Sequence, residues 1–146
     1  MLRDTSLIPL SHQHHNGLAL CVMTRRSLAK DTSATNVTKL AQRIIDRYEL
    51  ELINHFEIEE QVLFPACGPN PLVERLVAEH REMEALIPSL RNVPTAELLE
   101  RFCQILSTHI RREESELFEH IQKSLPRDVL DRIGVEINRL AVRICL

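Results

Sequence analysis

The chain of 146 residues is long enough to bury most of its apolar surface in one core, so we expect a single domain over residues 1–146. Its formal net charge is −3 with histidine neutral, and its basic residues form no stripe, which argues against nucleic acid as a partner. No apolar run approaches the span of a bilayer, and residues 1–6 lack the apolar stretch of a secretory signal. We therefore expect a cytoplasmic protein that binds neither nucleic acid nor membranes.

The composition favours helix over sheet, because the chain has only 3 glycines, one tyrosine and no tryptophan and is rich in leucine, isoleucine, glutamate and arginine. The first helix is expected over residues 11–30, followed by a loop over residues 31–36 that ends in Asn36 as an N-cap. Apolar residues then recur at helical spacing from residue 37 to residue 63, and Pro65 is expected to end this second helix.

Caps and prolines also mark the later helices. Asn70 is expected to cap the third helix, which has proline at its first position, and Pro88 is expected to bend or end it. Thr95 caps the fourth helix, Pro126 closes it, and a shorter amphipathic helix spans residues 129–144. Long helices with short connections predict an all-α fold: an antiparallel up-down-up-down four-helix bundle with a short C-terminal fifth helix. That fifth helix is expected to cover one end of the bundle or to meet a second subunit in a homodimer.

The cysteines of the chain lie far apart and form no CxxC pair, which argues against a cysteine zinc site or a thioredoxin-type site. We interpret them as the reduced thiols of a cytosolic protein. They are Cys21, Cys67, Cys103 and Cys145.

One motif, HxxxEExxLF, occurs twice. The first copy begins at His55 and ends at Phe64, and the second begins at His109 and ends at Phe118, 54 residues later. In an up-down bundle the second and fourth helices are parallel, so an approximate two-fold axis can relate the two copies. A site for two metal ions could lie on that axis.

Residues four apart lie on one face of a helix, so a histidine and a glutamate at this spacing project together. Three helices carry such a pair, and the first helix begins with a cluster of histidines. The pairs are His55 with Glu59, His80 with Glu84 and His109 with Glu113, and the cluster is His12, His14 and His15. The pairs of the second and fourth helices continue the apolar stripe that faces the core.

A single pair of this kind is more simply a salt bridge on a helix surface. Three pairs and a histidine cluster predict metal binding instead, because buried carboxylates are costly unless they are paired or bind metal. Imidazole and carboxylate ligands suit iron, manganese or zinc. The ferritin-like class is excluded, because it requires Glu-x-x-His pairs and no histidine here follows a glutamate at that spacing.

The ordered set of motifs resembles the hemerythrin-like (HHE cation-binding) domain over nearly the full chain. The resemblance rests on His14-His15-x-x-Leu18, the first HxxxEExxLF motif with the following Pro65, Glu79-His80, and His109-xxx-Glu113. It implies two iron ions joined by an oxo or hydroxo bridge, with terminal histidine ligands and two bridging glutamates. Carried over to this chain, the ligands are a histidine of the first helix, His55, His80 and His109, and the bridges are Glu59 and Glu113.

Two departures from the family pattern bear on function. Oxygen-carrying hemerythrins have a second histidine four residues after the ligand of the third helix, where this chain has Glu84. That difference argues against simple reversible oxygen carriage and makes the chain more similar to di-iron proteins that repair iron–sulfur centres. Those repair proteins also carry an N-terminal domain with paired cysteines, which this sequence lacks.

Several assignments stay open. Either His14 or His15 faces the metals, because the two point about 100° apart on a helix. Glu84 is either a seventh ligand or leaves one iron with an open position. Glu60 and Glu114 are expected to be solvated or to orient neighbours, and a surface position is favoured for Glu79, over contact with a ligand or a channel.

The leading hypothesis is a non-haem di-iron protein that binds, senses or reacts with oxygen, nitric oxide or peroxide, with iron storage or iron–sulfur repair as related roles. The second is a regulatory or interaction module with a structural metal, whose partner surface is the fifth helix. A zinc or manganese hydrolase is a weaker third, because no nucleophile or general base lies beside the ligands. Whether the protein turns over a substrate is left open.

Overall fold

The computed structural model describes residues 2–145, and within that range the chain is helical apart from short connections and has no strand. This confirms the all-α prediction. The segments are η1 (Thr5–Leu7), α1 (Ile8–Lys30), α2 (Ala34–Arg47), η2 (Tyr48–Leu52), α3 (Ile53–Ile58), η3 (Glu59–Leu63), α4 (Phe64–Cys67), α5 (Pro71–Asn92), α6 (Ala96–Arg112), η4 (Glu113–Leu117), α7 (Phe118–Ser124) and α8 (Arg127–Leu140). Among the described residues, no helix is both long and apolar enough to cross a bilayer.

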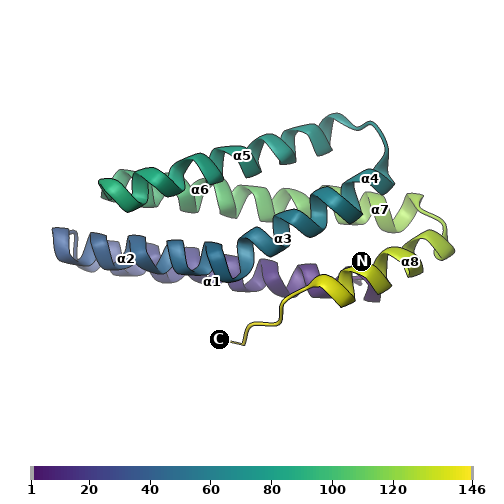
Figure 1. Cartoon of the computed structure of the whole chain (residues 1–146), viewed down its shortest axis with the longest axis horizontal. Coiled ribbons are helices and arrows are strands. Elements are labelled where there is room, and N and C mark those ends of the chain that lie inside the picture. The colour runs from purple at the N-terminus through teal and green to yellow at the C-terminus, as the bar shows by residue number, and fades with distance from the viewer. Residues whose placement is uncertain (1, 146) are drawn as a thin grey trace.

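Two of the long rods are built from several of these segments. Residues 34–67 form one continuous rod from α2 to α4, and residues 96–124 form another from α6 to α7. The segments η2, η3 and η4 are π-helical turns inside these rods. Figure 1 shows that consecutive rods run in opposite directions along the long axis of the molecule.

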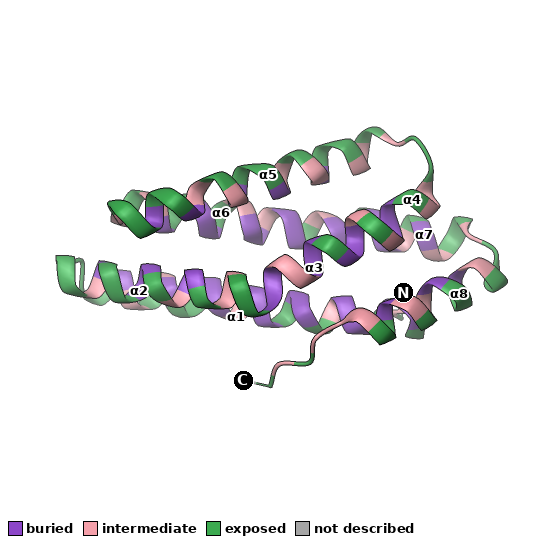
Figure 2. Cartoon of the chain, viewed as in Figure 1, coloured by how far each residue is buried: buried purple, intermediate pink, exposed green. Residues whose placement is uncertain are grey.

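The rods pack in a closed ring. Helix α1 contacts α2 and α6, and α5 contacts the same two helices from the other side. Helix α8 packs against η1 and also contacts α1, α3 and η3, so it lies against one half of the bundle (Figure 1). The buried residues line the inner faces of the rods (Figure 2).

The core consists of two apolar clusters with a polar layer between them. On α1, Leu10 belongs to the cluster near α8 and Leu20 to the other, and His14 lies between them. On α5, Leu76 and Met83 flank the buried His80 in the same way. The polar layer is therefore separated from solvent at both ends by packed apolar side chains.

Two of the predicted caps are confirmed and one is wrong. The side chain of Asn70 accepts a hydrogen bond from the N–H of Leu72, and that of Thr95 accepts one from the N–H of Leu98. Helix α2 begins three residues before the expected position, and its N-cap is Ser33. Asn36, the predicted cap, instead donates its own N–H to the Ser33 hydroxyl.

The prolines interrupt the helices less than expected. Helix α1 starts at Ile8, with a proline in its first turn, where the missing N–H costs nothing. Pro65 does not end the second rod, because it lies in the first turn of α4, just after a π-helical turn. The rod ends at Cys67, and Gly68 after it has a φ of 68°. Helix α5 passes through Pro88 and continues to Asn92. Pro88 is exposed, so the hydrogen bond that it cannot donate is lost on the solvent side of the helix.

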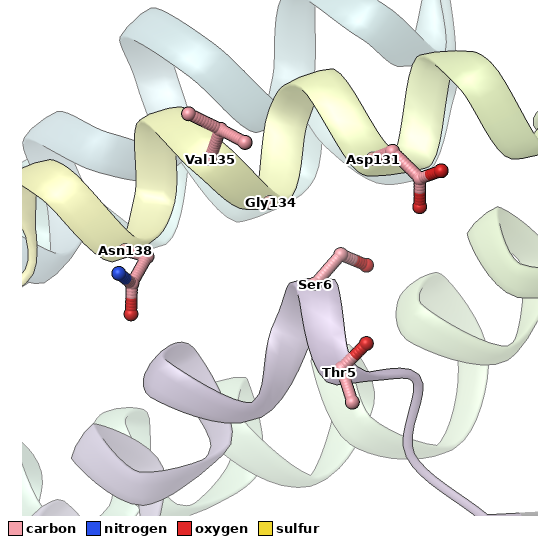
Figure 3. Close-up of a pocket in the computed structure, with 6 residues that line it drawn as sticks. All are labelled: Thr5, Ser6, Asp131, Gly134, Val135 and Asn138. Carbon is pink, nitrogen blue, oxygen red and sulfur yellow. The ribbon is translucent and has the colours of Figure 1, made fainter.

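The fifth helix is shorter than predicted, ending at Leu140 rather than residue 144. Residues 141–145 are not helical, and the carbonyl groups of Val142 and Ile144 accept hydrogen bonds from Gln13 and Asn16 of α1. Gly134 lets α8 approach the start of the chain, because a Cβ there would lie 2.8 Å from the Ser6 Cβ and 2.9 Å from its Cα. Figure 3 shows the two residues facing each other, where both line the same surface pocket.

We predict that Gly134→Ala destabilises the protein by about 1–3 kcal/mol, because a methyl group would press on the Ser6 backbone. Helix propensity alone predicts the opposite sign, a gain of about 1 kcal/mol. Urea denaturation measures the difference. The control is Val135→Ala at a position that is 67% exposed, with an expected change within about 0.5 kcal/mol. A Gly134→Ala variant as stable as the wild type would contradict this packing.

Candidate metal centre

Six ionisable side chains meet in the polar layer, and each is at most 2% exposed. They come from all four long rods of the bundle. They are His14 of α1, His55 of α3, Glu59 of η3, His80 of α5, His109 of α6 and Glu113 of η4. All six were predicted from the sequence as candidate metal ligands.

Their donor atoms form two overlapping groups. The first is His14, His55, Glu59 and Glu113, and the second is Glu59, His80, His109 and Glu113. Within each group the donor atoms all lie within 4.8 Å of one another. Because both glutamates belong to both groups, they can bridge two ions, each of which also receives two imidazoles.

The contacts inside the layer are short. The Oε1 atom of Glu113 lies 2.9 Å from the Nε2 atom of His14 and 3.2 Å from that of His109. The Nε2 atom of His80 lies 3.1 Å from Glu59 Oε1 and 3.1 Å from the Nε2 atom of His109. Donors bound to one ion at about 2.0–2.2 Å are themselves about 3–4 Å apart, so these spacings suit a shared ion.

Three buried atoms in this layer have no hydrogen-bond partner: His55 Nε2, Glu59 Oε2 and Glu113 Oε2. A buried polar atom without a partner costs about 1–3 kcal/mol, and more when it is charged. All three belong to the group of donors described above, and cations placed among them would satisfy each one. The residues present therefore fit a metal centre.

Each histidine is oriented by a hydrogen bond at its outer nitrogen. All four Nδ1 atoms have a side-chain oxygen within 2.8 Å, so all four Nε2 atoms face inward. The pairs are His14 with Glu114 at 2.6 Å, His55 with Gln13 at 2.8 Å, His80 with Glu60 at 2.7 Å, and His109 with Glu79 at 2.8 Å. Such bonds fix the ring and raise the basicity of a metal-binding imidazole.

These outer hydrogen bonds show the roles of the glutamates that lie next to the donor residues in the sequence. Glu60 and Glu114 orient histidines of neighbouring rods, which is one of the two expected roles. The surface position favoured for Glu79 is wrong, because its carboxylate is only partly exposed and accepts from His109 and Arg112. Gln13 was not considered at all, since glutamine rarely signals a metal site.

Glu59 and Glu113 each begin a π-helical turn. The N–H of Phe64 bonds the carbonyl of Glu59 and the N–H of Phe118 bonds that of Glu113, five residues apart in both cases. The wider turn lets the glutamate and the following Leu-Phe pair face the interior together, and both pairs are buried. π-Helical turns occur frequently at functional sites.

The structure places His14 in the layer and His15 on the exposed side of α1. The residues seven positions further along α1 explain the difference between the two histidines. Cys21, on the same face as His14, is 1% exposed, whereas Val22, on the same face as His15, is 46% exposed. Glu84 lies apart from the two donor groups and accepts a hydrogen bond from the exposed Arg81.

The electrostatics of the layer favour bound positive charge. Burial alone would lower the pKa of His55, but the carboxylates of Glu59 and Glu113 outweigh it and raise this pKa to about 10. The pKa of His109 is likewise raised well above its usual value, against burial, by Glu113 and Glu59. Burial would raise the pKa of Glu113, yet the adjacent histidines hold it well below its ordinary range.

A family model for the hemerythrin HHE cation binding domain matches residues 6–121, and the chain belongs to this family. The match covers most of the sequence and includes all six residues of the polar layer. No curated protein and no solved structure matches the chain.

The raised histidine pKa predicts a pH dependence for the metal-free protein. Protonated His55 stabilises the fold fully at and below pH 6.5, and this contribution is lost as the pH rises toward about 10. The free energy of unfolding, measured in urea, should therefore fall over that range. His55→Gln should reduce the fall, and His120→Gln at an exposed position should not. A wild-type stability that rises over this range would contradict the assignment.

Proposed function

We propose that the protein is a non-haem di-iron protein that binds, senses or reacts with oxygen, nitric oxide or peroxide. The observation that carries the proposal is the pair of buried donor groups that share Glu59 and Glu113. Membership of the cation-binding family supports metal binding in general. In this proposal four antiparallel rods hold the ions and α8 closes one side.

The donor set supports iron. Imidazole with carboxylate suits iron, manganese and zinc, and a site with two histidines, a carboxylate and open positions is typical of non-haem iron that reacts with oxygen. Each donor group offers two histidines and two shared carboxylates, so positions remain for a small ligand. Bound iron would supply the redox chemistry, while the protein residues orient the ions and exclude bulk water.

A cleft of about 330 Å³ beside the polar layer supports access by a small molecule. Its lining includes Phe56, Glu60 and Glu84. The ring of Phe56 stacks on the imidazole of His80, with 4.0 Å between the ring centroids, and Glu60 holds the same imidazole at its outer nitrogen. A diatomic molecule entering this cleft would therefore meet Phe56 and Glu60, the two lining residues that contact His80.

The alternative is a regulatory module with a structural metal. The buried polar atoms without hydrogen-bond partners favour this alternative, because a metal ion that satisfied them would stabilise the fold. The fifth helix supports it less well. Leu130, Ile133 and Ile137 of α8 are buried against the bundle of the same chain, so its apolar face is not free to dock a partner.

We predict two iron ions per chain after anaerobic reconstitution, with charge-transfer absorption in the near-ultraviolet after exposure to air. The double variant Glu59→Gln/Glu113→Gln should lose the metal and the absorption but remain helical by circular dichroism. Loss of the fold in this variant would favour the structural alternative. Fewer than one metal ion of any kind in the reconstituted wild type would contradict both functions.

A matched control removes two exposed carboxylates from the same two rods. Glu57→Gln/Glu116→Gln makes the same change in charge, outside the polar layer. This double variant should bind as much iron as the wild type, so a loss of iron in it would point to a general effect of charge rather than to the bridging positions.

A further inference from the structure

The outer hydrogen bonds follow the same two-fold relation as the repeated motif. Residues 13 and 14 of α1 correspond to residues 79 and 80 of α5, just as His55 with its two glutamates corresponds to His109 with its two. The bond from His14 to Glu114 then matches the bond from His80 to Glu60. The bond from His55 to Gln13 matches the bond from His109 to Glu79.

The one departure from this symmetry is chemical. Glu79 is an anion, held in place by Arg112, and its side chain is 13% exposed. Gln13 occupies the matching place with a neutral amide, and it is buried. Both histidines of one donor group therefore bond to carboxylates, whereas only one histidine of the other group does.

The contacts of Gln13 explain why this position has an amide rather than a carboxylate. Its Oε1 atom faces the Nδ1 atom of His55, and its NH₂ group donates to Asn54 Oδ1 at 3.0 Å and to the carbonyl of Val142 at 3.2 Å. A carboxylate could make only the first of these bonds, because it has no hydrogen to donate. Asn54 also bonds Leu140 and Val142, so Gln13 links His55 to the C-terminal segment after α8.

We propose that Gln13 and Glu79 make the two metal positions unequal: the ion at His80 and His109 is held tightly, and the ion at His14 and His55 is the exchangeable one. The inference rests on the proposed di-metal centre. A carboxylate at the outer nitrogen makes imidazole a stronger ligand than an amide does, and changing such a partner alters metal affinity about 10–100-fold. Gln13 and Glu79 act as positioning residues, because neither belongs to the two donor groups.

The test is an equilibrium titration of the metal-free full chain with Co²⁺ against a competing chelator, followed by the visible absorption of the bound ion. The wild type should bind two ions in two steps. Mutual repulsion of two cations also separates two steps, so the decisive readout is which step each variant moves. Glu79→Gln should weaken the tighter step about 10–100-fold, and Gln13→Glu should strengthen the weaker step.

Both variants should therefore reduce the difference in affinity between the two binding steps, one by weakening the tighter step and the other by strengthening the weaker step. The controls are Glu74→Gln on α5 and Gln104→Glu on α6, which make the same changes of side chain at exposed positions. Melting temperatures of all metal-free variants show whether the fold is intact. Because Gln13→Glu also loses the bonds to the C-terminal segment, Glu79→Gln is the stricter test.

Two results would overturn the inference while leaving the di-metal centre in place. One is a pair of steps that neither variant moves, and the other is a Glu79→Gln variant whose weaker step is the one that shifts. A wild type that binds fewer than two Co²⁺ ions would instead remove the di-metal centre itself, and the inference with it.

Discussion

The polar layer is organised around two carboxylates, Glu59 and Glu113, that are fully buried at the centre of the bundle. Anions are not stable inside an apolar core unless positive charge neutralises them. Four imidazoles surround this pair, and the raised pKa values of His55 and His109 show how strongly the site attracts protons when metal is absent. Metal ions at the same place would satisfy the carboxylates and release those protons.

The bundle meets this requirement by using one arrangement twice. The repeated motif supplies a histidine, a glutamate that belongs to both donor groups and a second glutamate that holds a histidine of a neighbouring rod. A π-helical turn that begins at each of these shared glutamates keeps the glutamate and the apolar residues after it inside. The two apolar clusters enclose the layer from both ends.

Much of this could be predicted from sequence, because helical spacing alone places histidine and glutamate on the core face. The choice of His14 could not, since both neighbouring histidines fit an apolar stripe until the exposure of Val22 is known. Gln13 was missed, and a surface position was favoured for Glu79, for one physical reason: both act across helix interfaces, and spacing along one helix does not report on such contacts. The end of the second rod was misplaced because the sequence gives no sign of a π-helical turn before Pro65.

The central claim is that the polar layer holds two ions between shared carboxylates. Crystals of the iron-reconstituted protein, with diffraction data collected on both sides of the iron absorption edge, test it most directly. The account predicts two anomalous peaks that both contact Glu59 and Glu113, one beside His14 and His55 and the other beside the remaining two histidines of the layer. A single peak, or iron bound only outside the layer, would contradict it.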